Sequence, residues 1–129
     1  MTKMKISMDE WLLEAKNSKD ADKVGMWLTH NGVVRSTAKA EVREGKASPK
    51  VTAMNFSYDK EKLEAILSKG RALEGVYYLR AELASGKLMP GDDIMFVLIG
   101  ADTRPHAVDA LNSVVGEIKE CCVKEEEVF

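Results

Sequence analysis

The sequence lacks the cysteine patterns of disulfide-bonded or zinc-binding proteins. Its only two cysteines, Cys121 and Cys122, are adjacent, and adjacent cysteines rarely bridge because disulfide geometry does not suit neighbouring Cα positions. A reduced thiol pair in the cytoplasm is the plain interpretation. With His30 and His106 they do not give the pairwise ligand spacing of a structural zinc site, so we expect no metal.

Long apolar segments are also missing. The notable apolar run, Ile94–Ile99, is far shorter than the ~20 residues that a membrane-spanning helix needs. The polar start of the chain contains no stretch that fits a signal peptide. We therefore expect a cytoplasmic protein that does not enter a membrane.

No excess of positive charge is present. The chain has 19 Lys and Arg residues against 21 Asp and Glu residues, a net charge of -2, which argues against binding to duplex nucleic acid. Neither the Gly-x-Gly-x-x-Gly string nor a P-loop string occurs, so dinucleotide and P-loop chemistry lack their phosphate-binding loops. We expect no cofactor.

The composition that remains is that of a folded protein. With 129 residues, 45% apolar and 31% charged, the chain is long enough for one domain over residues 1–129. A domain of this size buries roughly two thirds of the surface of its unfolded chain, so folding requires neither a disulfide nor a metal.

Secondary structure can be predicted for most of the first half. A capping box at Ser7 predicts a helix to about residue 16, and residues 24–34 have the composition of a strand interrupted near Asn31-Gly32. Residues 38–50 are polar and contain Gly45 and Pro49, which predicts a mobile connection. Residues 51–58 alternate as a strand does.

The second half contains two predicted helices, of which the one that begins at Thr103 or Arg104 is the clearer. Asp59 can cap the other helix, which ends at Gly70 or continues to residue 73, whereas residues 71–85 fit helix and strand equally well. Residues 94–99 suit a strand that is buried on both faces. The clearer helix follows this strand. This order indicates an α+β or mixed α/β fold, with one sheet covered on one face.

Cations are the candidate functional residues. Arg35 follows the break in the first strand, and Arg104 lies where free N–H groups and the helix dipole favour an anion. Lys119 and Lys124 extend the set. Each of these also fits a solvated surface charge. His30 and His106 fit surface or capping roles better than a general base.

Several motifs together resemble a known family, the large, catalytic subunit of molybdopterin synthase. The resemblance covers Ile6 to Lys124. Its elements are Thr29-x-x-Gly32-x-Val34-Arg35, Gly86-x-Leu88-x-Pro90-Gly91-Asp92, the run Ile94–Val97, then Arg104, Ala107 and Ala110, and finally Ile118-Lys119.

The resemblance implies an α+β fold of the alpha/beta-hammerhead type, with a mixed, largely antiparallel sheet packed against helices and a strand at residues 76–83. It implies a homodimer that binds a ubiquitin-like sulfur-carrier small subunit. The implied activity is that of a sulfurtransferase in molybdenum cofactor biosynthesis. Sulfur passes from the carrier's C-terminal thiocarboxylate to cyclic pyranopterin monophosphate, giving the dithiolene of molybdopterin.

The resemblance also assigns roles to residues. Lys119 and Lys124 match catalytic lysines, and Arg35, Arg104 and Thr103 match substrate-binding positions. Thr103 replaces a family histidine, and Lys124 arrives two residues early. On one continuous helix Arg104 and Lys119 would lie about 22 Å apart, so we expect a site shared between two subunits.

A second interpretation is a non-catalytic paralogue. Such a protein would keep the fold and the dimer and would act as a binding or regulatory module for the sulfur carrier. A binding module would tolerate Lys119→Ala, whereas the enzyme would not.

Overall fold

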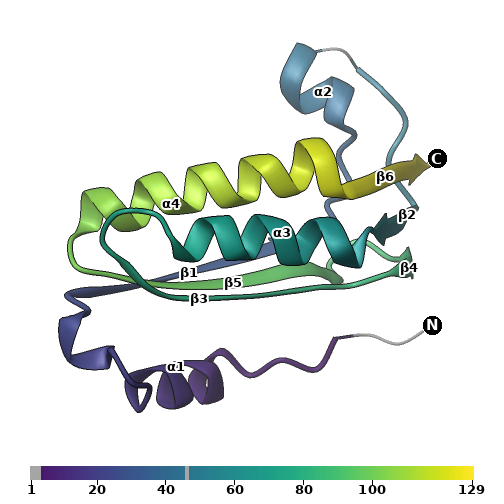
Figure 1. The fold of residues 1–129 in the computed structure, drawn as a ribbon. Helices are drawn as coiled ribbons and strands as arrows, with labels where there is room; N and C mark the ends of the chain where they lie inside the picture. The colour runs from purple at the N-terminus through teal and green to yellow at the C-terminus, as the bar shows by residue number, and fades with distance from the viewer. Residues whose placement is uncertain (1–3, 46) are drawn as a thin grey trace.

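The computed structural model describes residues 4–45 and 47–129 (Figure 1). Along the chain the elements are α1 (Met8–Lys16), the 3-10 helix η1 (Ala21–Lys23), β1 (Met26–Val33), α2 (Lys39–Glu44), β2 (Ala53–Tyr58), α3 (Lys60–Arg71), β3 (Val76–Leu83), β4 (Gly86–Leu88), β5 (Asp93–Ala101), α4 (Arg104–Glu117), the π-helix η2 (Ile118–Cys122) and β6 (Val123–Val128). The α+β class is confirmed.

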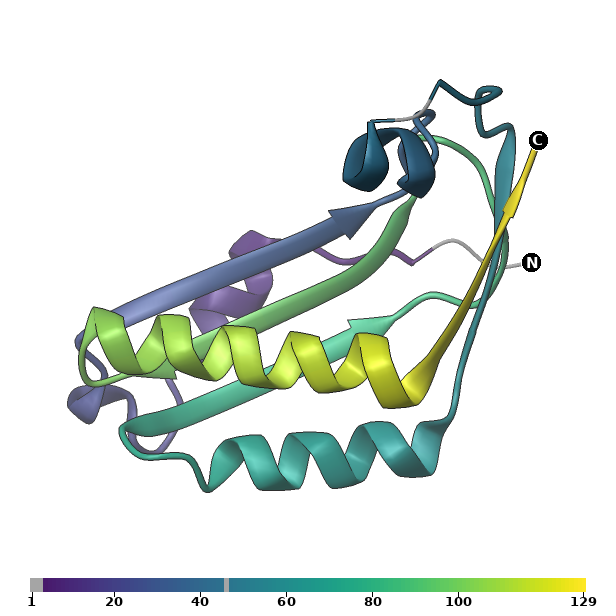
Figure 2. The same cartoon turned by 90° about the horizontal axis from the view of Figure 1, so that it is seen from above.

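The strands form two antiparallel sheets. One has the order β1-β5-β3 and the other the order β4-β2-β6. Helices α3 and α4 lie side by side across one face of the first sheet, and α1 covers its opposite face (Figures 1 and 2). The expectation of one sheet covered on one face was therefore wrong on both counts.

The central strand β5 explains why both faces are covered. Its alternate side chains Met95, Val97 and Ile99 join the main core under α3 and α4, whereas Phe96 and Leu98 face α1. Trp11 and Ala15 of α1 complete this second, smaller core. An apolar strand that is buried on both faces requires a layer on each side.

Most predicted elements are present. Ser7 caps α1 by accepting a hydrogen bond from the Glu10 amide at 3.3 Å, and the Asp59 carboxylate caps α3 through the Lys62 amide at 3.0 Å. The strand implied by the resemblance at 76–83 is β3. In β1 the register shifts between Gly32 and Val33, at the predicted interruption.

Two elements were not foreseen. The connection 38–50, of which residue 46 lies outside the described residues, contains the short helix α2. At the C-terminal end, β6 pairs with β2 although Glu125, Glu126 and Glu127 are poor strand formers. Pairing with β2 over the whole of β6 outweighs this local preference.

Candidate functional site

Arg35 and Lys119, two of the five predicted site residues, lie in one cavity. It has a volume of about 60 Å³ and lies where α2, η2 and β6 meet the end of β1. Its lining carries four cations and two carboxylates: Arg35, Lys39, Arg43, Lys119, Glu125 and Glu127. The apolar part of the lining is Val33, Met54 and Ile94. We refer to this cavity as the cation pocket.

Main-chain hydrogen bonds fix the position of Arg35. Val34 is buried, its amide donates to the Asp92 carbonyl at 2.9 Å, and its carbonyl accepts from the Gly91 amide at 2.7 Å. These bonds hold the chain after β1 against the turn at 89–92. The exposed Arg35 side chain donates from Nε to the Thr37 carbonyl at 3.1 Å.

Lys119 lies on the π-helical turn that follows α4. Its neighbours on η2, Ile118 and Cys122, are buried in the main core. Burial of these two side chains turns Lys119 outward, where its side chain is 41% exposed. π-Helical turns are rare and often occur at functional sites.

Glu125 is the buried carboxylate of the cation pocket. Its side chain is only 7% exposed, its Oε2 accepts from Lys39 Nζ, and its Oε1 lies 3.1 Å from Lys119 Nζ. Within the described residues Oε1 accepts no well-aligned hydrogen bond, so Lys119 holds it mainly by charge. Burial alone would raise the pKa of Glu125, but the hydrogen bond from Lys39 and the charge of Lys119 outweigh it and lower that pKa.

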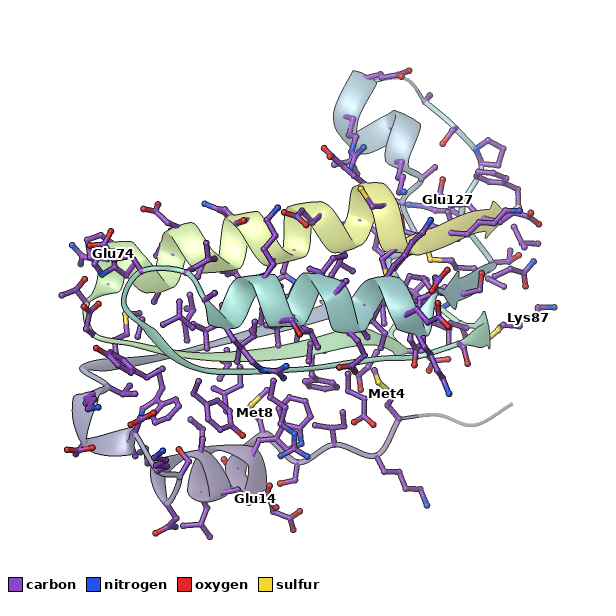
Figure 3. The ribbon with its side chains drawn as sticks, viewed as in Figure 1. Met4, Met8, Glu14, Glu74, Lys87 and Glu127 are labelled. Carbon is purple, nitrogen blue, oxygen red and sulfur yellow. The ribbon has the colours of Figure 1, made fainter. Side chains whose placement is uncertain are left out.

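Glu127 fixes helix α2 above this carboxylate. It is two residues further along β6, so its side chain shares a face of the strand with Glu125. Both carboxylate oxygens of Glu127 accept from the Lys39 amide, at 3.1 and 3.3 Å. Figure 3 shows Glu127 beside α2 and the end of α4.

His30 does not line the cation pocket, but the charge of Lys119 acts on it. It shares a face of β1 with Met26 and Leu28, which contact the core under α4. Burial is the main cause that lowers the pKa of His30, and the charge of Lys119 adds to it. The imidazole is therefore mainly neutral near pH 7, and a neutral ring can both accept and donate a proton.

Lys124 lies on the other side of β6. It lines a separate cavity of about 330 Å³ together with Asn55, Phe56, Ser57, Gly86, Lys87 and Glu126. Successive side chains of a strand point to opposite faces, so Lys124 and Glu125 cannot share a cavity. Lys119 and Lys124, which the resemblance pairs, are therefore separated within one chain.

Arg104 and Thr103 are also separate from the cation pocket. They begin α4, at the end of the helix opposite to Lys119 (Figure 1). The Asp102 carboxylate accepts from the Thr103 amide at 2.7 Å and lies 2.6 Å from His106 Nδ1. Glu74, labelled in Figure 3 at this end of α4, lies 4.0 Å from His106 Nε2.

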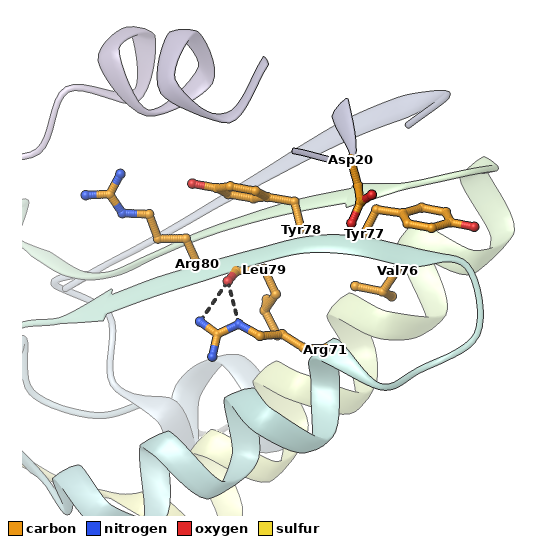
Figure 4. A pocket seen from close by; sticks show the side chains of 7 residues that line it. All are labelled: Asp20, Arg71, Val76, Tyr77, Tyr78, Leu79 and Arg80. Carbon is orange, nitrogen blue, oxygen red and sulfur yellow. Dashed lines mark hydrogen bonds between the residues drawn. The ribbon is translucent and has the colours of Figure 1, made fainter. Parts of the chain in front are cut away.

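A larger cavity lies at the exposed edge of β3 and contains none of the predicted residues. Its volume is about 510 Å³, and its lining is Asp20, Arg71, Val76, Tyr77, Tyr78, Leu79 and Arg80 (Figure 4). Arg71 is engaged there, since its Nε and Nη2 donate to the Leu79 carbonyl at 3.2 and 2.9 Å. We favour the smaller cation pocket as the site because cations from separate elements converge in it.

The cation pocket is suited to an anion. Lysine and arginine side chains from α2, from η2 and from the connection after β1 face one small volume, and such groups bind carboxylate or phosphate oxygens. Within the described part of the chain, no three His, Cys, Asp or Glu side chains are placed to hold a metal ion. None of the described helices has the length and apolar character to cross a membrane.

Sequence reasoning missed Lys39, Arg43, Glu125, Glu127 and His30. Lys39 and Arg43 lie in the segment that the sequence predicts to be a mobile connection, and three consecutive glutamates do not predict a strand. The alternation of Glu125 and Glu127 on one side of β6 was a usable signal, but only once that segment is known to be a strand.

Comparison with known proteins gave one family and several solved structures. A family model described as MoaE protein matches residues 1–121. The structure of molybdopterin synthase from Staphylococcus aureus has a TM-score of 0.76 and 16% identity, covering 98% of this chain and 88% of that one. The MoaE protein from Burkholderia ambifaria MC40-6 has a TM-score of 0.71 and 19% identity, with 98% and 84% coverage.

A third structure is a complex. Subunits 1 and 2 of molybdopterin-converting factor from Helicobacter pylori 26695 give a TM-score of 0.65 and 16% identity, covering 95% of this chain and 78% of that chain. No curated protein matches the chain significantly. At these identities the structural likenesses show the fold.

Proposed function

Because the chain belongs to the MoaE protein family, whose model matches residues 1–121, we propose that it is the sulfur-transferring large subunit of a molybdopterin synthase. Membership in this family supports a role in molybdopterin biosynthesis. The observation that carries the finer proposal is the meeting of Arg35 and Lys119 with two further cations in the cation pocket.

The proposed partner is a small sulfur-carrier subunit with a C-terminal thiocarboxylate. The likeness to a complex of two subunits of molybdopterin-converting factor supports a small-subunit partner. An extended tail with a terminal anion requires positive groups at its end, and Arg35, Lys39 and Lys119 supply them. The phosphate of the pterin substrate requires further cations, for which Arg43 is available.

In the proposed reaction the sulfur of each thiocarboxylate forms a C–S bond to a side-chain carbon of the cyclic pyranopterin phosphate, while a C–O bond at that carbon breaks and its oxygen leaves in water or on the phosphate. Water then hydrolyses the bond between the sulfur and the carrier's acyl carbon, so the sulfur stays on the pterin and the carrier leaves as an ordinary carboxylate. Lys119 holds the thiocarboxylate and passes protons to the reacting groups, since its ammonium group carries three N–H donors on a flexible stem. His30, which is neutral beside it, is a second candidate for proton transfer.

A homodimer completes this proposal. Arg104 and Thr103 lie at the end of α4 opposite to Lys119, and fourteen helical residues at ~1.5 Å each span about 21 Å. One small substrate cannot contact both ends. Arg104 of a second copy would supply its cation to the cation pocket, and Lys124 would act from the opposite side of β6 on a different part of the tail or substrate.

Dithiolene formation from the cyclic pterin and a thiocarboxylated carrier tests the proposal. We expect the wild-type chain to form product and Lys119→Ala to lower the rate by about 10²–10⁴-fold, the usual contribution of a positioned proton-transfer group. Lys69→Ala is the matched control, because Lys69 makes a surface ion pair with Glu117 at 2.7 Å. A wild-type rate no higher than that of Lys119→Ala would refute the enzymatic proposal.

The non-catalytic alternative rests on a specific observation. Glu125 already neutralises Lys119, the residue on which catalysis depends. If the chain only binds the carrier, Lys119→Ala will leave carrier capture intact and the wild-type chain will form no dithiolene.

A further inference from the structure

Glu125 occupies the place in the cation pocket where an anionic ligand would bind. Its carboxylate lies between Lys39 of α2 and Lys119 of η2, and its side chain is 7% exposed. A carboxylate that is held by two lysines has the chemistry of the carboxylate end of a peptide.

The small size of the cavity also indicates that Glu125 occupies the place of an anionic ligand. About 60 Å³ accommodates a few water molecules, whereas small-molecule sites measure roughly 300–1,000 Å³. A terminal anion that binds between Lys39 and Lys119 must take the place that the Glu125 carboxylate occupies. Binding there requires the Glu125 side chain to move away from at least one lysine.

Helix α2, which lies above Glu125, is bound to β6 through Lys39. Helix α2 has six residues, and its first residue, Lys39, is bound to β6 by its side chain through Glu125 and by its amide through Glu127. Release of the Lys39 side chain from Glu125 still leaves the bond from its amide to Glu127. Exchange of one carboxylate for another therefore does not require α2 to detach.

We propose that Glu125 is an exchangeable internal counter-ion that an incoming carboxylate displaces from Lys39 and Lys119. The proposal rests on the proposed function for the identity of that carboxylate, the end of a carrier tail. Glu125 offsets one of the two positive charges of Lys39 and Lys119, and an anion must compete with it to bind between them. The affinity of the site for anions is thus set by an acidic residue of β6.

Glu125→Gln tests the exchange, because it keeps the shape of the side chain and removes its charge. The probe is a synthetic peptide that ends in Gly-Gly with a free carboxylate, and its Kd is measured by isothermal titration calorimetry. We expect the variant to bind the peptide at least about tenfold more tightly than the wild-type chain, as close charge pairs couple by this much or more. Glu120→Gln, an exposed residue next to Lys119, is the matched control and should change Kd by less than about twofold.

Two further measurements test whether the peptide's carboxylate replaces Glu125. The same peptide with an amidated end should gain nothing from Glu125→Gln, and an equal gain would overturn the exchange. A second measurement uses the isotope-labelled wild-type chain and so does not depend on the folding of a variant. In its NMR spectrum, the side-chain carboxyl carbon resonance of Glu125 should shift as the peptide is added. If the wild-type chain binds the peptide, equal or weaker binding by a folded Glu125→Gln variant would also overturn the exchange.

Binding of inorganic phosphate to the wild-type chain and to Glu125→Gln tests the counter-ion role independently of the proposed function. If neither chain binds the peptide but Glu125→Gln binds phosphate about tenfold more tightly than the wild-type chain, the counter-ion role stands and the carrier-tail assignment fails. If neither the peptide nor phosphate gains affinity, the counter-ion role fails whatever the chain does with its carrier.

Discussion

At the residue scale, the folded protein shifts the pKa values of its two histidines in opposite directions. A hydrogen bond with Asp102 is the main cause that raises the pKa of His106, and the nearby charges of Glu74 and Asp109 add to it. Burial is the main cause that lowers the pKa of His30. The protonated form is thus favoured at the start of α4 and disfavoured beside Lys119.

This difference predicts a pH-dependent effect of His106→Gln. The stabilisation from the His106–Asp102 pair is fully present below the unfolded-state pKa of about 6.5 and is lost as the pH rises through the higher folded-state pKa. We expect the loss of Tm caused by the substitution to be larger near pH 6 than near pH 9. Thermal melts of both chains at the two pH values measure it.

The control for that experiment is His30→Gln, for which the sign reverses. Because the folded state disfavours protonated His30, wild-type stability falls as the pH drops below about 6.5. The substitution should therefore be more favourable near pH 6 than near pH 9. Equal effects at both pH values for His106→Gln would contradict the assigned ion pair.

At the element scale, the contact between α3, α4 and β3 depends on a glycine. A Cβ atom added to Gly70 would lie 2.6 Å from Leu79 Cδ2 and 2.8 Å from Val114 Cγ2. The Leu79 methyl can move, but the β-branched Val114 has little rotamer freedom within a helix. The absence of a side chain at this position lets α3 approach its neighbours.

Gly70→Ala should therefore destabilise the protein by about 1–3 kcal/mol, the usual cost of overpacking a core. Gly116→Ala is the matched control, since a Cβ there meets nothing within 4 Å. We expect that control to stabilise α4 by about 0.4–1 kcal/mol, through lower entropy of the unfolded chain. Urea unfolding of both variants measures the two free energies, and equal signs would refute the close packing.

The strand conformation of β6 depends on its pairing with β2 and not on its own residues. Its central residues are Lys124 and three glutamates, which have little local preference for a strand. All six residues nevertheless pair with β2, from Val123 opposite Tyr58 to Val128 opposite Ala53. This pairing turns Glu125 and Glu127 toward the cation pocket and Lys124 away from it.

At the scale of the whole molecule, four of the five candidate residues fall into two regions, and Lys124 lines a separate cavity on the other side of β6. Arg35 and Lys119 meet at one end of α4, and Thr103 and Arg104 lie at the other end. A net charge of -2 conceals this local gathering of cations. A dimer in which each site takes Arg104 from the second copy would unite the two regions.

Mixing two inactive variants tests the shared site. If each site takes Lys119 from one subunit and Arg104 from the other, a heterodimer of Arg104→Ala and Lys119→Ala chains keeps one intact site. After unfolding and refolding together, the mixture should recover about a quarter of wild-type dithiolene formation, since half of random dimers are heterodimers. Each variant refolded alone is the control, and a mixture no more active than these controls would exclude a shared site.

The sequence by itself determined the order of most helices and strands and the doubly buried β5, and it predicts Arg35 and Lys119, which line one cavity, as site residues. Those features follow from periodicity over a few residues and from motifs of fixed spacing. Only the tertiary structure decided that β6 pairs with β2, that Lys124 faces away from Lys119, and that Lys39 meets Glu125 from 86 residues away. Contacts at such separations depend on how whole sheets and helices pack, and no local pattern encodes that packing.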